Sequence, residues 1–111
     1  MELTKLSDTV AYLELPPEPR IRNVLDSVNE QVSEKCECDI ILDFSFVEVL
    51  TSVSISNLIT LQNWLKGGGY RLTLCEVAVV TKCIFDVAGL IPVFTFAPDK
   101  DAALQSLKKT G

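Results

Sequence analysis

The chain has no histidine and is short of basic residues, aromatic residues and long apolar runs. Without an imidazole, catalytic sites and zinc sites that depend on histidine are excluded. Ten basic against fifteen acidic residues give a net charge of −5, which argues against direct binding to nucleic acid or to anionic membranes. No apolar run approaches the roughly 18 residues that span a bilayer, and the first residues do not resemble a signal peptide. We therefore expect a cytoplasmic protein without membrane insertion.

The chain contains four cysteines. In a reducing cytoplasm they are expected to be thiols rather than disulfides. A single residue separates Cys36 from Cys38, whereas paired zinc ligands usually stand two to four residues apart. Cys75 and Cys83 lie in apolar stretches that we expect to be buried. The sequence therefore predicts no metal site.

What the sequence does contain is the composition of a globular domain. Its 111 residues are 48% apolar and 23% charged, a balance typical of folded proteins. A chain of this length can bury a substantial core, so residues 1–111 are expected to form a single domain.

Hydrophobic periodicity predicts the elements of the first third. Two short β-type runs, at 2–7 and 10–15, flank a turn and favour an antiparallel hairpin. Prolines within 16–19 end the second run, because proline cannot donate to a strand ladder. A helix then follows over 20–35. Its apolar residues fall at i, i+3, i+4, i+7 and i+11, and they are Ile21, Val24, Leu25, Val28 and Val32.

The remaining chain predicts alternating strands and helices, which gives the order β-β-α-β-α-β-α-β-α. We therefore expect an α/β fold with a mixed sheet of about five strands and four helices. The glycine triplet at 67–69 follows a helix, so it predicts a turn rather than a phosphate-binding loop, and no cofactor is expected. The expected elements are a strand at 40–44, a helix at 52–66, a strand at 70–75, a helix with apolar side Val79, Val80, Cys83, Ile84, Val87 and Leu90, a strand at 93–96 and a last helix that starts at Pro98 and ends in Lys108, Lys109 and Gly111.

The stretch 40–61 carries the main functional hypothesis. A buried strand leads into a cluster of hydroxyls, Thr51, Ser52, Ser54 and Ser56, and then into an amphipathic helix. Hydroxyls at a helix start can cap the unpaired N–H groups of its first turn. The same position suits a phosphate, since the helix dipole is positive there. Ser52 is therefore either a capping or turn residue or a site of modification, and capping is the expected role of Ser54.

Other candidates point to structure more than to chemistry. Asp43 and Glu48 form a possible carboxylate pair, but no nucleophile and base accompany them at a recognisable spacing. We therefore predict that the protein is not an enzyme and has no catalytic residues. Trp64 is expected at the solvent edge of its helix or in the core. The phenylalanines expected in the core are Phe85, Phe94 and Phe96.

The segment from Leu42 to Ser52 resembles the central signature of the STAS domain family, the anti-sigma-factor antagonists. That signature has the form L-D-[LF]-S-x-V-x-[FV]-[IL]-D-S-[ST]-G-[LI], and it aligns here with LDFSFVEVLTSVSI, residues 42–55. The resemblance extends over 68–72, 85–90 and the C-terminal part of the chain, covering about 39–107.

The resemblance implies a regulatory function. Such proteins bind a kinase-type anti-sigma factor while the signature serine is unmodified, and phosphorylation of that serine by the partner releases them. A phosphatase then restores binding. The matching position here is Ser52, with Thr51 and Ser54 as alternative acceptors. The partner-binding residues implied are Thr51, Ser52, Val53, Ser54, Ser56 and Asn57.

Three positions depart from the family pattern. Thr51 stands where the family has an acidic residue, Val53 replaces a second hydroxyl, and Ser54 stands where the family has glycine. These departures leave an alternative open, in which the domain is a constitutive scaffold or accessory subunit of a signalling or transport assembly without a phosphorylation switch.

Overall fold

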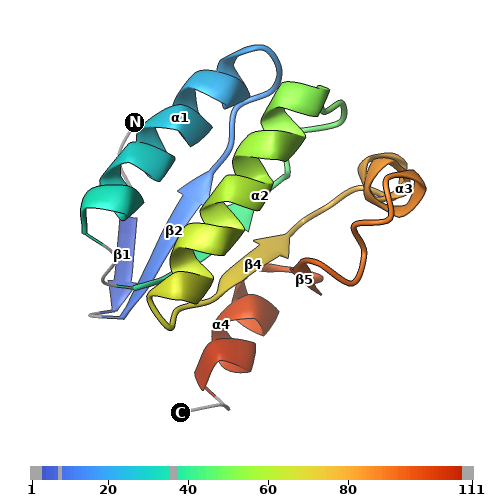
Figure 1. Cartoon of the computed structure of the whole chain (residues 1–111). Coiled ribbons are helices and arrows are strands. Elements are labelled where there is room, and N and C mark those ends of the chain that lie inside the picture. The colour runs from blue at the N-terminus through green and yellow to red at the C-terminus, as the bar shows by residue number, and fades with distance from the viewer. Residues whose placement is uncertain (1–3, 8, 36–37, 109–111) are drawn as a thin grey trace.

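A computed structural model of the chain describes residues 4–7, 9–35 and 38–108. Nine elements follow one another in the predicted order, and Figure 1 shows their arrangement. They are β1 (Thr4–Ser7), β2 (Val10–Glu14), α1 (Arg20–Glu34), β3 (Asp39–Asp43), α2 (Ser52–Gly67), β4 (Leu72–Cys75), α3 (Val79–Val87), β5 (Thr95–Ala97) and α4 (Lys100–Lys108).

The strands form one mixed sheet in the order β1-β2-β3-β4-β5. The hairpin predicted at the N-terminus is present, with β1 antiparallel to β2. Each of the other neighbours is parallel, and a helix connects each parallel pair. This is the arrangement that βαβ crossovers favour, so the predicted α/β class with a mixed sheet is confirmed.

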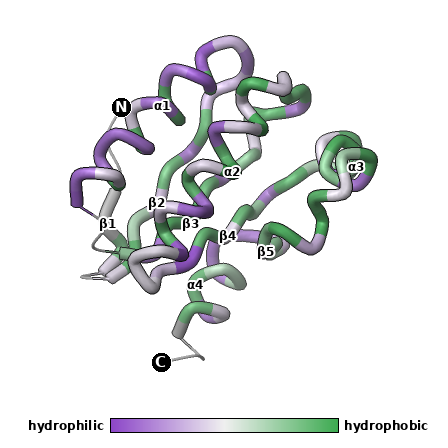
Figure 2. Tube along the Cα trace, in the orientation of Figure 1, coloured by the Kyte–Doolittle hydropathy of each residue, from purple (hydrophilic) through white to green (hydrophobic). Residues whose placement is uncertain are grey.

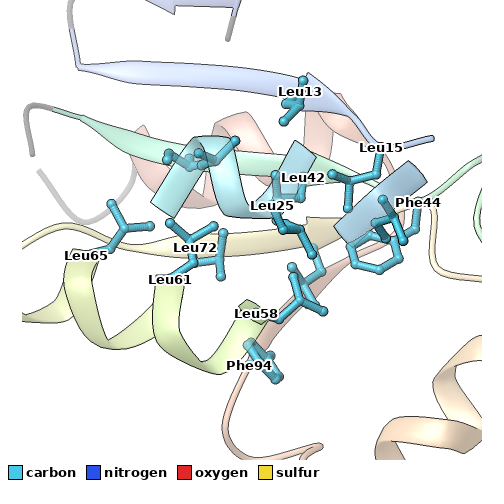
Figure 3. Close-up of a cluster of buried hydrophobic side chains, with 14 of the residues drawn as sticks. Leu13, Leu15, Leu25, Leu42, Phe44, Leu58, Leu61, Leu65, Leu72 and Phe94 are labelled. Atoms are coloured by element: carbon cyan, nitrogen blue, oxygen red, sulfur yellow. The ribbon is translucent and has the colours of Figure 1, made fainter. Parts of the chain in front are cut away.

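Two helices cover one face of the sheet. α1 and α2 lie side by side in Figure 1, and both pack on the larger core cluster. Leucines from strands and helices meet there, as Figure 3 shows for Leu13, Leu42 and Leu58. The buried residues of α1 are Ile21, Leu25, Val28 and Val32, all on its predicted apolar side.

The opposite face carries a smaller core under α4. The strand residues of this core alternate along the sheet with those of the first face. They are Val10, Ile41 and Cys75, and they pack with Ala103 and Leu107. Both faces of β4 are therefore covered, and all four of its residues are buried. A strand covered on one face alone would bury only every second residue.

The predicted orientation of α3 is wrong. Its buried residues are Thr81 and Phe85, whereas Val79 is 82% exposed and Val87 90% exposed. Cys83, predicted to be buried, is also exposed. Phe85 decides the orientation, because its ring packs edge-to-face against three other phenylalanines of the core: Phe44, Phe94 and Phe96. The burial of one large aromatic side chain therefore determines which side of α3 packs on the core, although several valines lie on the other side.

The other cysteines and aromatics lie closer to expectation. Cys38 and Cys75 are buried free thiols, and Cys36 lies outside the described residues. Burial raises the pKa of the Cys75 thiol to about 12, with the nearby Asp43 carboxylate adding to the shift. Trp64 is 47% exposed, at the solvent edge of α2.

Two structural facts bear on function classes. None of the helices within the described residues combines the length and hydropathy that a bilayer crossing requires. In the same ranges, no three side chains of the metal-ligating types gather as a metal site would need.

Candidate functional site

The loop that joins β3 to α2 begins at a buried carboxylate. Asp43 accepts hydrogen bonds from the Tyr12 hydroxyl, from the Ser45 hydroxyl and, at 2.7 Å, from the backbone N–H of Ser45. Burial, followed by the hydrogen bond to Asp43, raises the pKa of Tyr12 well above its usual range. Glu48 is exposed on the same loop. The hydrogen bonds of Asp43 therefore serve to fix the end of β3.

Further along this loop, two buried apolar side chains and two hydrogen-bonded carbonyl groups hold it against the rest of the domain. Val47 and Leu50 are buried in the main core. The buried hydroxyl of Thr81, on α3, donates to the carbonyl oxygens of Val47 at 3.1 Å and of Glu48 at 2.8 Å. Held in this way, the loop exposes Phe46 (60%) and Val49 (64%). Large apolar side chains that are exposed on a fixed loop are typical of a binding surface.

α2 begins at Ser52 and is capped by the residue before it. Thr51 has extended backbone angles, and its hydroxyl accepts the backbone N–H of Ser54 at 3.2 Å. The capping role expected for Ser54 is therefore wrong, since Ser54 supplies the N–H that is capped. The side chain of Ser54 is fully buried, where it accepts a hydrogen bond from the Thr51 hydroxyl at 3.3 Å.

The Glu18 carboxylate lies against the same helix start. It accepts the backbone N–H of Thr51 at 2.8 Å. A carboxylate near a helix N-terminus is stabilised by the helix dipole, and the first turn of α2 itself contains no acidic residue. Beside it is a surface hollow of about 370 Å³, lined by Pro17, Glu18, Ser45, Phe46, Glu48 and Val49.

The predicted site residues are brought together at this end of α2, but they differ in access. Ser52 and Ser56 are exposed, and Val53 is 45% exposed. Asn57 is partly buried and its amide donates to Asp26 of α1 at 3.0 Å, which joins the two helices.

Sequence reasoning missed Glu18, Phe46 and Val49. Glu18 is separated from Thr51 by 33 positions, so no local pattern reveals their hydrogen bond. The outward direction of Phe46 and Val49 was hidden because all of 46–50 except Glu48 is apolar. Their spacing of three residues, interleaved with the buried Val47 and Leu50, was the available indication.

Comparison with known proteins gives a fold but no close relative. No family model matches the chain, and no curated protein matches it. Among solved structures, an anti-sigma-factor antagonist (STAS) domain protein from Planctomyces limnophilus superimposes with a TM-score of 0.82 at 17% identity, over 96% of this chain and 97% of that one. The chain has the STAS fold.

Two further STAS-fold neighbours show the range of proteins that share this architecture. The anti-sigma-factor antagonist SpoIIAA of Bacillus matches in its unphosphorylated form with a TM-score of 0.79 at 14% identity, over 97% of this chain and 96% of SpoIIAA. A sulfate transporter family protein from Wolinella succinogenes matches with a TM-score of 0.73 at 20% identity, over 96% of this chain and 89% of that one.

Proposed function

We propose that this STAS domain is a non-enzymatic regulatory protein of the cytoplasm that binds a kinase-type anti-sigma factor through the surface around Ser52. Phosphorylation of Ser52 by that partner releases it, and a phosphatase restores binding. One observation carries the proposal: an exposed serine at the first residue of α2 follows a fixed loop that exposes Phe46 and Val49, and is itself followed by the exposed Val53.

The local electrostatics suit a switch that acts on binding rather than on the fold. A phosphate on Ser52 adds about −1.5 to −2 charges at pH 7. The dipole of α2 favours that charge within the domain, whereas the Glu18 carboxylate at the same helix start opposes it. Phosphorylation is therefore expected to push Glu18 away from the N–H of Thr51. It also places a charge beside apolar side chains that a partner would desolvate.

The departures from the family pattern are compatible with this function. Threonine, like aspartate, is a favourable N-cap residue, and Thr51 performs that role. Ser54 fits at the position where the family has glycine, because its hydroxyl is buried against that of Thr51. Burial also makes Ser54 a poor phosphate acceptor, which leaves Ser52 ahead of Thr51, whose hydroxyl already accepts the capping bond.

The solved neighbours add support by analogy. SpoIIAA, which is described as an anti-sigma-factor antagonist, matches this chain in both its unphosphorylated and its phosphorylated form. At 14% identity the likeness extends to the fold, so the function of this chain depends on its own site.

A phosphosite map of the protein isolated from its native cells with phosphatase inhibitors tests the proposal. Phosphate on Ser52 is expected. The protein partners recovered with the wild-type chain should also be recovered with Ser52→Ala and lost with Ser52→Asp. Ser106→Asp, a change at an exposed serine on α4, is the matched control and should retain them.

A constitutive scaffold is the second candidate, favoured by the match to a sulfate transporter family protein. In that case Ser52→Ala and Ser52→Asp would retain the same partners equally, and Ser52 would carry no phosphate under any growth condition. Phosphate on Thr51 would retain the switch but move its acceptor by one residue.

A further inference from the structure

α3 presents an apolar stripe to solvent. Val79, Cys83 and Val87 are spaced four residues apart and are exposed, with Val80 beside them at 59% exposed. Valine is a weak helix former, so a solvent-facing helix gains nothing from valines at these positions. Figure 1 shows α3 apart from α1 and α2, and Figure 2 shows hydrophobic colour along it. The stripe is therefore accessible and unexplained by the packing of the domain.

One edge of the stripe carries two opposite charges one helical turn apart, Lys82 and Asp86, both exposed. The Lys82 ammonium lies 4.9 Å from the centre of the Phe96 ring, which holds it at this edge. Within one helix, a lysine that precedes an acidic residue by four positions is the less favourable order for an ion pair. When two copies of α3 pack antiparallel, by contrast, each Lys82 can lie opposite the Asp86 of the other copy and pair with it across the contact.

The shape of the stripe agrees with that arrangement. A hollow of about 380 Å³ is lined by Ile91 and by the four α3 residues Val79, Lys82, Cys83 and Asp86. Those four positions, at i, i+3, i+4 and i+7, form the type of hole that receives a side chain of a facing helix. In an antiparallel pair that aligns Lys82 with Asp86 of the other copy, the Asp86 side chain of that copy lies over the hole, beside Lys82.

We propose that α3 is a self-association surface, on which a second copy of this chain packs its α3 antiparallel about a two-fold axis. The two apolar stripes cover one another, and two Lys82–Asp86 pairs form along the charged edge. A nine-residue helix buries less area than a standard interface, so the dimer is expected to be weak, with a dissociation constant on the order of 100 μM. This surface is separate from the Ser52 site.

Sedimentation velocity of the full chain up to about 1 mM, roughly tenfold above that constant, measures the association. Wild type should form a dimer, and Val87→Glu should raise the dissociation constant at least about tenfold, since a buried carboxylate is costly. Val49→Glu is the control, because it adds the same charge at another exposed valine, on the β3–α2 loop. It should dimerise like wild type. Circular dichroism checks that both variants fold.

A charge exchange tests the antiparallel geometry. Lys82→Glu and Asp86→Lys should each be monomeric alone, because each replaces both ion pairs of the contact with pairs of like charge. Mixing the two single variants should restore a dimer. In the mixed pair the introduced glutamate of one chain faces the introduced lysine of the other, and the remaining native Asp86 faces the remaining native Lys82.

Three results would overturn the proposal. A monomeric wild type at the highest concentration excludes self-association, and would leave the stripe to another class of protein. A dimer disrupted by Val49→Glu but not by Val87→Glu places the contact on another face. Single charge variants whose mixture remains monomeric exclude the antiparallel arrangement.

Discussion

The helices α2 and α3 share a buried hydroxyl in the first turn but differ in their caps and in the surfaces that they expose. The third residue of each is a fully buried hydroxyl, Ser54 in α2 and Thr81 in α3. Each hydroxyl bonds to the β3–α2 loop, through Thr51 in one case and through the carbonyls of Val47 and Glu48 in the other. One loop therefore positions both helix starts, and its conformation is shared between the two candidate surfaces.

The difference lies in the first two residues of each helix. α2 exposes Ser52 and Val53 there, so a hydroxyl that can be modified lies beside a single valine. α3 exposes Val79 and Val80, which offer contact area and no group to modify. α2 therefore exposes a surface suited to regulation, whereas α3 exposes a surface suited to a weak contact between two copies.

The sharpest test of this comparison lies within α3 itself. Phe85→Ala should lower the free energy of unfolding by about 3–5 kcal/mol, because it opens a cavity among three packed rings. Val87→Ala, two residues away and 90% exposed, should change it by less than about 0.5 kcal/mol. Urea unfolding measures both. Equal losses would mean that the valine stripe, and not Phe85, is the buried side of α3.

The next largest effect is expected at the shared loop. Thr81→Val retains the shape of the side chain but removes the donor to two carbonyl oxygens, and should cost about 1–3 kcal/mol. Thr60→Val is the matched control, since the Thr60 hydroxyl donates to a carbonyl of its own exposed helix surface. If both variants unfolded at the same urea concentration as wild type, Thr81 would not anchor the loop.

A smaller loss is expected at the start of α2. Thr51→Ala removes the cap and should cost about 1 kcal/mol, whereas Thr51→Ser retains a capping hydroxyl and should cost only a few tenths. Thermal unfolding of the two variants makes the comparison. Equal losses would show that the methyl group of Thr51 matters and that its hydroxyl does not.

The sequence predicted the architecture well because element order depends on local pattern. Proline at 16–19, glycine at 67–69 and the apolar spacing of α1 mark boundaries without knowledge of the tertiary structure. Which side of α3 is buried could not be predicted in this way. Counting apolar residues favoured the side with Val79, Cys83 and Val87, whereas Phe85 and its ring contacts determine the buried side.

The candidate site was predicted only in part. The position of Ser52 at a helix start follows from the hydroxyl cluster and the preceding strand. The choice of Thr51 as the cap depends on backbone angles, and the role of Glu18 depends on a contact across 33 residues. Neither is encoded in a local pattern, so these parts of the site required the structure.

The smallest effect is expected at alkaline pH, on the sheet face under α4. Both the Tyr12 hydroxyl and the Cys75 thiol have a pKa raised by burial, the thiol from 9.0 to about 12. A raised pKa in the folded state stabilises the fold below the unfolded pKa, and this stability is lost as the pH rises above it. For Cys75 the loss begins near pH 9 and should stay below about 1 kcal/mol at pH 9.5.

Urea unfolding between pH 7 and pH 10 measures this decline. Cys75→Ala should flatten it, because the variant has no thiol to ionise, and Tyr12→Phe should flatten it further near pH 10, where tyrosine begins to ionise. Tyr70→Phe is the matched control, since it removes the other tyrosine and leaves the hydrogen bond between Tyr12 and Asp43 in place. An unchanged decline in Cys75→Ala would mean that the thiol is more accessible to water than its burial under α4 indicates.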